Sequence, residues 1–218
     1  MLSNGSSSSP RHPHVRTTAL TLSFAAAGVL VSGAPVAQAA TGRPHHDTRP
    51  ECRGEGVDPT ARIRYRSDIV IKAPLRTVFA LQADVERWPA WQAPVLTSER
   101  LDAGPLRKGS RFRWTTPGPP TPTTPATTMT ITSTVRQLRH NACILWSGPA
   151  VGQGVRIDEG VHLWTFTKVK GGVRVHTEET WTGAQAEADV PWATEILGAG
   201  LEAWLRDLKA TAEARTGR

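Results

Sequence analysis

The sequence lacks several features that would place it in a specialised class of protein. Only two of its 218 residues are cysteine, which is too few for a scaffold built on disulfides. No apolar run reaches the roughly 20 residues that a membrane-spanning helix needs. No five basic residues follow one another, and the arginines are scattered. These absences exclude a multi-span membrane protein and argue against nucleic-acid binding.

Motifs for several kinds of reactive site are absent as well. The glycines between residues 148 and 154 lack the lysine and the spacing of a phosphate-binding loop. No Gly-x-Ser-x-Gly motif occurs, and no set of histidines and cysteines has the spacing of a zinc site. We therefore expect neither a metal nor a cofactor.

Tryptophan is the residue that is present in excess. The chain has 8 Trp against 4 Phe and 1 Tyr, with 39% hydrophobic and 21% charged residues and a net charge of +7. The overall balance is that of a soluble folded domain. So many tryptophans exceed the needs of a minimal core and suggest large rings that line a site.

The first 39 residues have the layout of a secretory signal peptide. Residues 1–18 carry arginines but no acidic residue, an apolar run of 13 residues follows at Ala19–Val31, and Ala37-Gln38-Ala39 offers a small-x-small cleavage site. This order predicts export by the general secretory route and cleavage near Ala39, giving a secreted or cell-envelope protein. An uncleaved anchor or a misassigned start codon is the alternative.

Residues 40–60 combine proline, glycine and charge without periodicity, which predicts a flexible tail. Adjacent His45 and His46 lack the spacing of a closed metal site. In an oxidising compartment Cys52 and Cys143 would pair and close a loop of about 90 residues. The open alternative is that Cys143 is a small buried residue on a strand.

From residue 61 to residue 216 the pattern becomes that of an α+β domain. Alternating and helical spacings predict a strand, two short helices, further antiparallel strands and a long C-terminal helix. The strands are expected at 63–71, 97–101, 110–115, 129–138, 142–147, 160–169 and 173–181, and the helices after Pro74, at Val85–Trp88 and at Trp192–Ala214. The proline-rich stretch Pro117–Pro125 is expected to be an extended loop. A curved sheet that packs on the long helix would bury both apolar faces.

Four phrases in this domain resemble a known family. They are TVFALQADVERWPAWQ (77–92), GSRFRW (109–114), EGVHLWTF (159–166) and GGVRVHTEETWTG (171–183). They are similar to the polyketide cyclase/dehydrase and lipid-transport group of the START-like, or SRPBCC, superfamily, over about residues 57–215. The resemblance implies a helix-grip fold of about six to seven strands, with a cavity between the sheet and the long helix. It also implies binding of lipids, sterols, plant hormones or polyketides, and in a subset cyclisation, aromatisation or dehydration.

The register of the last hairpin follows from its turn. If Lys170-Gly171 is a two-residue turn, then His162 lies opposite Glu179, Trp164 opposite Thr177 and Phe166 opposite Val175. Directly opposed residues point to the same face of a sheet. This face is the apolar one, so His162 and Glu179 are expected to lie inside, next to one another.

The His162–Glu179 pair is the sharpest chemical signal in the sequence. A carboxylate beside an imidazole orients the ring and selects its tautomer, as a general acid or base requires. The competing explanation, which the residues favour, is a buried pair that anchors a strand or a ligand. Glu178 and His176 alternate to the outer face, where Glu178 is expected to be solvated. His140 lies in a turn and should be exposed.

The aromatic residues predict the walls of a ligand site. The expected lining residues are Trp88, Trp91, Phe112, Trp114, Trp146, Trp164, Phe166 and Trp181. The alternative is that these rings only fill the core. Trp204, on the apolar stripe of the last helix, is expected to be a core residue.

Three functions follow from these observations. The first is an exported protein that holds a hydrophobic small molecule, lipid or polyketide-like, with His162 and Glu179 as its polar anchor. The second is a polyketide cyclase, aromatase or dehydratase in which the same pair provides acid–base catalysis. The third is a basic module that binds anions of the cell envelope. None of the three involves nucleic acid.

Overall fold

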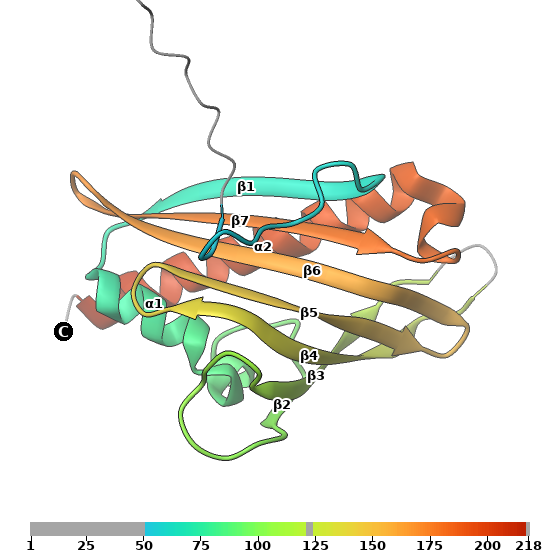
Figure 1. Ribbon diagram of the computed structural model, residues 1–218, viewed down its shortest axis with the longest axis horizontal. Coiled ribbons are helices and arrows are strands. Elements are labelled where there is room, and N and C mark those ends of the chain that lie inside the picture. The colour runs from blue at the N-terminus through green and yellow to red at the C-terminus, as the bar shows by residue number, and fades with distance from the viewer. Residues whose placement is uncertain (1–50, 121–123, 217–218) are drawn as a thin grey trace, which may run out of the picture. The chain divides into compact units, whose positions relative to one another are not determined.

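The computed structural model describes residues 51–120 and 124–216 of the chain. The predicted signal peptide at 1–39 lies outside the described residues, as does the first half of the predicted tail. Seven antiparallel strands form one curved sheet in the order β1-β7-β6-β5-β4-β3-β2, and the long helix α2 runs along one of its faces (Figure 1). This is the predicted helix-grip arrangement. We call the face that meets α2 concave and the other face convex.

The elements follow the predicted order. The strands are β1 (Ile63–Ile71), β2 (Thr97–Arg100), β3 (Arg111–Gly118), β4 (Thr127–Arg139), β5 (Cys143–Gly152), β6 (Val155–Val169) and β7 (Gly172–Thr182). The helices are α1 (Leu75–Ala83), α2 (Val190–Thr216) and the short 3-10 helices η1 (Val85–Ala90) and η2 (Ala186–Asp189).

Several strands extend beyond their predicted ends. β6 begins at Val155 rather than 160, β5 continues to Gly152, and β3 runs through Pro117 to Gly118, inside the expected loop. The apolar alternation that marks a strand stops where side chains leave the core. Backbone pairing continues past that point because its hydrogen bonds do not depend on side-chain type.

The last hairpin has the predicted register. His162 pairs with Glu179, Trp164 with Thr177 and Phe166 with Val175. The turn is Lys170-Gly171, and Gly171 has a φ of 85°, which glycine adopts without strain.

Part of the convex face is covered by residues 51–60, which we call the N-terminal strap. Cys52 forms a disulfide with Cys143 at the start of β5, 91 residues further along the chain. Cys52 and Val57 pack with Leu145 and Leu163 on this face of the sheet, and the strap crosses it opposite α2 (Figure 1). The strap therefore differs from the flexible tail expected through residue 60, because the disulfide and Val57 hold it on the sheet.

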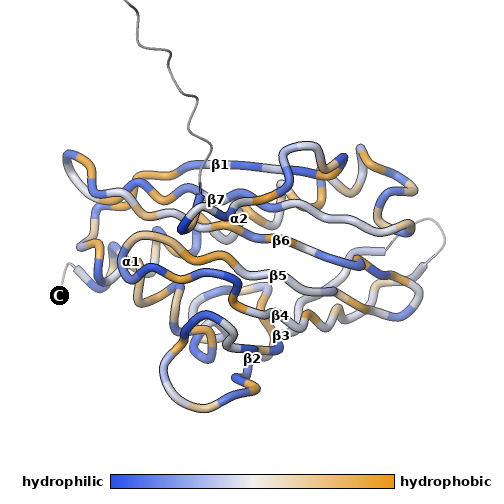
Figure 2. Tube along the Cα trace, in the orientation of Figure 1, coloured by the Kyte–Doolittle hydropathy of each residue, from blue (hydrophilic) through white to orange (hydrophobic). Residues whose placement is uncertain are grey.

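The start of β5 shows the effect of cover on both faces. Cys143, Ile144 and Leu145 form a continuous hydrophobic segment (Figure 2), and each is at most 4% exposed. Such a run is typical of a strand that is buried on both sides. Cys143 and Leu145 face the strap, whereas Ile144 belongs to the concave core.

Helix α2 packs on the concave face through its apolar stripe. Leu197, Leu201, Trp204, Leu205 and Leu208 are all buried. Gly198 lets the helix approach β1, because a Cβ at this position would lie 2.7 Å from the ring of Tyr65. No helix in the described ranges is both long and apolar enough to cross a membrane.

Candidate functional site

The space between α2 and the central strands is occupied by an aromatic cluster. We define this cluster by six residues: Trp88, Phe112, Trp114, Trp146, Trp164 and Trp204. They come from η1, from strands β3, β5 and β6, and from α2. Each strand contributes only its concave-facing positions, as the alternation of the sequence predicts.

Trp88 of η1 lies at the centre of the cluster and is fully buried. Its ring centroid is 4.9 Å from that of Trp204, 5.4 Å from Phe112, 5.6 Å from Trp146 and 5.8 Å from Trp114. Three of these contacts are edge-to-face, the arrangement that aromatic quadrupoles favour. The rings therefore fill the space in which the sequence suggested a lined cavity.

The other predicted wall residues lie around this cluster. Trp91 is partly buried and packs against the same core. Phe166 contacts Phe79 of α1 at 5.4 Å, and His140, which is exposed as predicted, lies 5.0 Å from the same Phe79 ring. Trp181 packs near the N-terminal half of α2. A pocket of about 180 Å³ lies elsewhere, between α1 and the end of α2, and includes none of these residues.

The His162–Glu179 pair lies beside the cluster. His162 Nδ1 is 3.0 Å from Glu179 Oε2, and the His162 side chain is 5% exposed against 17% for Glu179. Trp181 Nε1 donates to the other carboxylate oxygen over 2.7 Å. The His162 ring lies 4.9 Å from the Trp164 ring and 5.1 Å from the Trp146 ring. The carboxylate thus holds the imidazole in one orientation against two aromatic walls.

Thr177 completes this arrangement; the predicted register placed it on the inner face opposite Trp164 but did not identify it as a site residue. Its hydroxyl is 2.8 Å from His162 Nε2, and the residue is fully buried. When Nδ1–H donates to Glu179, Nε2 of the neutral imidazole accepts a hydrogen bond from the Thr177 hydroxyl. The hairpin register already places Thr177 on the same inner face as His162. Threonine is common in strands, however, so the residue type alone does not indicate a role in a site.

A second polar pair adjoins the first one. Tyr65 of β1 is the register partner of Glu179, and its hydroxyl donates to Glu202 of α2 over 3.1 Å. The hydrogen bond to the Glu202 carboxylate, together with burial, raises the pKa of Tyr65. A row of polar groups therefore extends from α2 across β1, β7 and β6.

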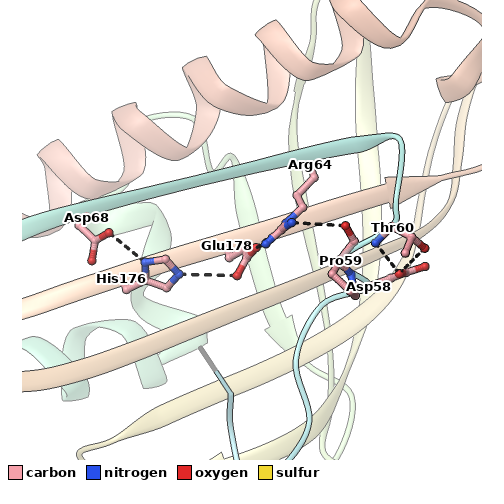
Figure 3. A network of polar contacts seen from close by, with 7 residues as sticks. All are labelled: Asp58, Pro59, Thr60, Arg64, Asp68, His176 and Glu178. Carbon is pink, nitrogen blue, oxygen red and sulfur yellow. Dashed lines mark hydrogen bonds and ion pairs between the residues drawn. The ribbon is translucent and has the colours of Figure 1, made fainter. Parts of the chain in front are cut away.

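On the convex face, Glu178 corrects a sequence expectation. It was expected to be solvated, yet it is 1% exposed. Arg64 of β1 forms an ion pair with it, His176 Nε2 lies 3.7 Å from its Oε2, and His176 Nδ1 lies 3.0 Å from Asp68 (Figure 3). Arg64 also donates to the carbonyl of Pro59 in the strap. Burial under the strap is possible because the carboxylate has charged partners.

This convex network makes stability depend on pH. Burial disfavours protonation of His176, but the Glu178 and Asp68 carboxylates outweigh it and raise the pKa of His176 above 6.5. Burial likewise favours neutral Glu178, but His176 and Arg64 outweigh it and lower the pKa of Glu178 below 4.5. The contribution of His176 to the free energy of unfolding is complete below pH 6.5 and is lost as pH rises through the raised pKa of His176. The contribution of Glu178 is complete above pH 4.5 and is lost as pH falls through the lowered pKa of Glu178.

We therefore expect the free energy of unfolding to be larger at pH 5.5 than at pH 8.5 because of His176. Urea unfolding at both pH values, with the wild type and His176→Gln, measures this difference. This difference should shrink in His176→Gln. It should persist in the control His140→Gln, because the exposed His140 contacts Phe79 outside the convex network. An unchanged difference in His176→Gln would contradict this assignment.

No group of three or more potential metal ligands occurs within residues 51–120 and 124–216. The candidate site consists of an aromatic cluster bordered by a histidine, two carboxylates, a tyrosine and a threonine.

Comparison with solved structures shows the same fold in proteins of low sequence identity. The di-domain ARO/CYC StfQ from the steffimycin biosynthetic pathway aligns with a TM-score of 0.55 and 16% identity, over 72% of this chain and 52% of that one. This chain thus spans about half the length of StfQ. Ara h 8.0201 aligns with a TM-score of 0.53 and 10% identity, over 69% and 97%. A protein from Thermus thermophilus aligns with a TM-score of 0.53 and 16% identity, over 70% and 98%.

No protein of curated function matches the chain. A family model described as "Polyketide cyclase / dehydrase and lipid transport" matches residues 62–213, which is most of the domain. The match covers the sheet, the aromatic cluster and nearly all of α2. The chain belongs to the polyketide cyclase/dehydrase and lipid transport family.

Proposed function

We propose that this protein binds a hydrophobic small molecule, of lipid or polyketide type, between the sheet and α2. The observation that carries the proposal is the aromatic cluster, with the His162–Glu179 pair at its border. Ligand sites are typically apolar spaces with a few convergent polar groups. The family contains both lipid-transport proteins and cyclases, which supports this class of ligand.

Binding requires the cluster to open. Trp88 occupies the centre of the space, and it belongs to η1, a 3-10 helix of six residues that is interrupted by Pro89. A short element with a weak hydrogen-bond pattern is easier to displace than a strand of the sheet. In this proposal η1 moves away from the sheet together with Trp88, and the remaining rings of the cluster form the walls of the ligand site.

We further propose that the protein is exported. Two observations support this step: the signal-like order of residues 1–39 and the Cys52–Cys143 disulfide. Disulfides persist in oxidising compartments outside the cytosol. An exported member of the family would carry a finished hydrophobic molecule rather than a biosynthetic intermediate.

The first test is a mass measurement on protein purified from its native secretion route. We expect a native mass spectrum to show a mass above that of the chain, and a denatured spectrum to show the chain alone, with its new N-terminus near Ala40. The difference identifies the ligand. A native mass equal to the chain mass, combined with no binding of added lipids or aromatic polyketides, would contradict the binding function.

Catalysis is the second candidate, and the His162–Glu179–Thr177 arrangement is the observation that favours it. His162 would act as a general base oriented by Glu179 in cyclisation or dehydration. If so, His162→Gln should abolish turnover of the bound molecule and leave its affinity nearly unchanged. Equal loss of turnover and affinity would instead assign the pair to ligand anchoring.

A further inference from the structure

Several buried hydrogen-bond donors in and beside the aromatic cluster have no acceptor, and the indole Nε1 of Trp91 is one of them. Two others belong to fully buried residues that adjoin Trp204: the indole Nε1 of Trp164 and the amide Nε2 of Gln82 in α1. Within the described ranges no protein atom accepts a hydrogen bond from either of them. An unpaired buried donor is unfavourable, so each such group calls for an explanation.

The orientation of the Gln82 amide follows from its neighbour. Trp204 Nε1 lies 3.0 Å from Gln82 Oε1, and an indole nitrogen only donates. The amide oxygen must therefore face Trp204, which leaves the NH₂ group as the unpaired end. Trp88 Nε1 donates to the backbone carbonyl of the same Gln82.

Both residues adjoin the same ring. Gln82 is hydrogen-bonded to Trp204, and the centroid of the Trp164 ring is 6.1 Å from that of Trp204. The His162–Glu179 pair, in contrast, uses its polar atoms internally, on Glu179 and Thr177. The unpaired polar atoms of Trp164 and Gln82, the two residues that adjoin Trp204, are both donors.

Gln92 is the other buried amide of this region, with neither amide atom paired. It offers both donor and acceptor atoms, so it does not select the polarity of a ligand. The preference for an acceptor group on the ligand comes from Trp164 and Gln82, whose unpaired atoms are both donors.

We propose that Trp164 Nε1 and Gln82 Nε2 form an anchor for an acceptor oxygen of the ligand. This inference rests on the proposed binding function and specifies its ligand class: a largely apolar, uncharged molecule with a carbonyl oxygen that enters beside Trp204. An ammonium group or a plain hydrocarbon accepts no hydrogen bond and would leave the two donors unpaired. Sites built to hydrogen-bond a group discriminate strongly against analogues that lack it.

The test uses two probes of nearly equal shape, 2-acetylnaphthalene and 2-isopropenylnaphthalene, which differ by a carbonyl oxygen in place of a methylene. Calorimetric titration of the full mature chain gives the dissociation constant of each. We expect the ratio of the two constants to favour the ketone in the wild type. In Trp164→Phe this preference should fall about fivefold or more, since the variant removes the indole donor and breaks no other hydrogen bond.

Trp192→Phe is the matched control. It makes the same change of size on α2, but Trp192 lies outside the aromatic cluster. Its ketone preference should equal that of the wild type. The infrared stretch of the bound carbonyl provides a second measurement, and it should shift to lower wavenumber in the wild type by more than in Trp164→Phe.

The outcomes separate the two proposals. If both probes bind and the ratio of their dissociation constants is the same in the wild type and the variants, the proposed anchor is contradicted and the binding function stands. If neither probe binds, the binding function itself is contradicted for this class of molecule, and the anchor with it. Should Trp164→Phe fail to fold, an unshifted carbonyl stretch in the wild type still overturns the anchor.

Discussion

Replacing Trp88 by alanine is expected to lower the free energy of unfolding by about 4 kcal/mol, the size found for large-to-small substitutions of buried aromatic residues. Trp88 is fully buried and touches four aromatic rings. The substitution removes these contacts and leaves a cavity that the neighbouring rings, held on strands, fill only in part. It also frees the backbone carbonyl of Gln82. Chemical denaturation monitored by circular dichroism measures the change.

The matched control is Trp192→Ala, because Trp192 of α2 is only partly buried. Its substitution should cost less than half as much, since less apolar surface is returned to water. Added indole should bind the Trp88→Ala cavity and restore part of the lost stability, as a ligand that binds only the folded state does. Equal losses in the two variants would show that Trp88 is not the centre of the packing.

Removing the disulfide is expected to lower the free energy of unfolding by an amount similar to that expected for Trp88→Ala. The Cys52→Ala/Cys143→Ala double variant opens a loop that spans 91 residues, and chain entropy assigns about 4 kcal/mol to a closure of this length. The cost arises mainly in the unfolded chain, which gains conformations when the link is absent. Urea denaturation of the double variant and the oxidised wild type gives the difference in the free energy of unfolding.

The double variant should also loosen the N-terminal strap. Amide hydrogen exchange is expected to rise in residues 52–60, while β6 and β7 keep most of their protection because the backbone pairing of those strands is unchanged. A loss below about 1 kcal/mol would contradict the entropic account. Faster exchange throughout the sheet would show instead that the strap is part of the folding core.

The position of the His162–Glu179 pair was predictable because the rule behind it is local. A two-residue turn at Lys170-Gly171 sets the pairing of the hairpin, and alternation sets which side chains share a face. No information from distant parts of the chain enters this step. The same rule places Thr177 on the inner face, but the rule does not predict its hydrogen bond to His162. The partner of Tyr65, Glu202, was beyond such reasoning, because it depends on how α2 lies over β1.

The arrangement of the tryptophans could be predicted only in part from alternation and helical spacing. Alternation placed Trp114, Trp146 and Trp164 on the inner face, and helical spacing placed Trp204 on the stripe that meets it. Whether these rings line an open cavity or close on one another depends on the distance between the sheet and α2. It also depends on the position of η1, which carries Trp88 into the centre. Both are results of packing between elements that are far apart in the sequence.

The sequence alone therefore determined the order of elements, the hairpin register and the inner face, because each depends on residues that are close together along the chain or across one turn. The tertiary structure decided the closure of the aromatic cluster, the burial of Glu178 and the course of the strap. Glu178 alternates outward, as predicted, but residues 51–60 return to cover that face, tied by the Cys52–Cys143 link and the bond from Arg64 to Pro59. Whether an outward face meets water or protein depends on a segment outside the sheet, and alternation within a strand contains no information about it.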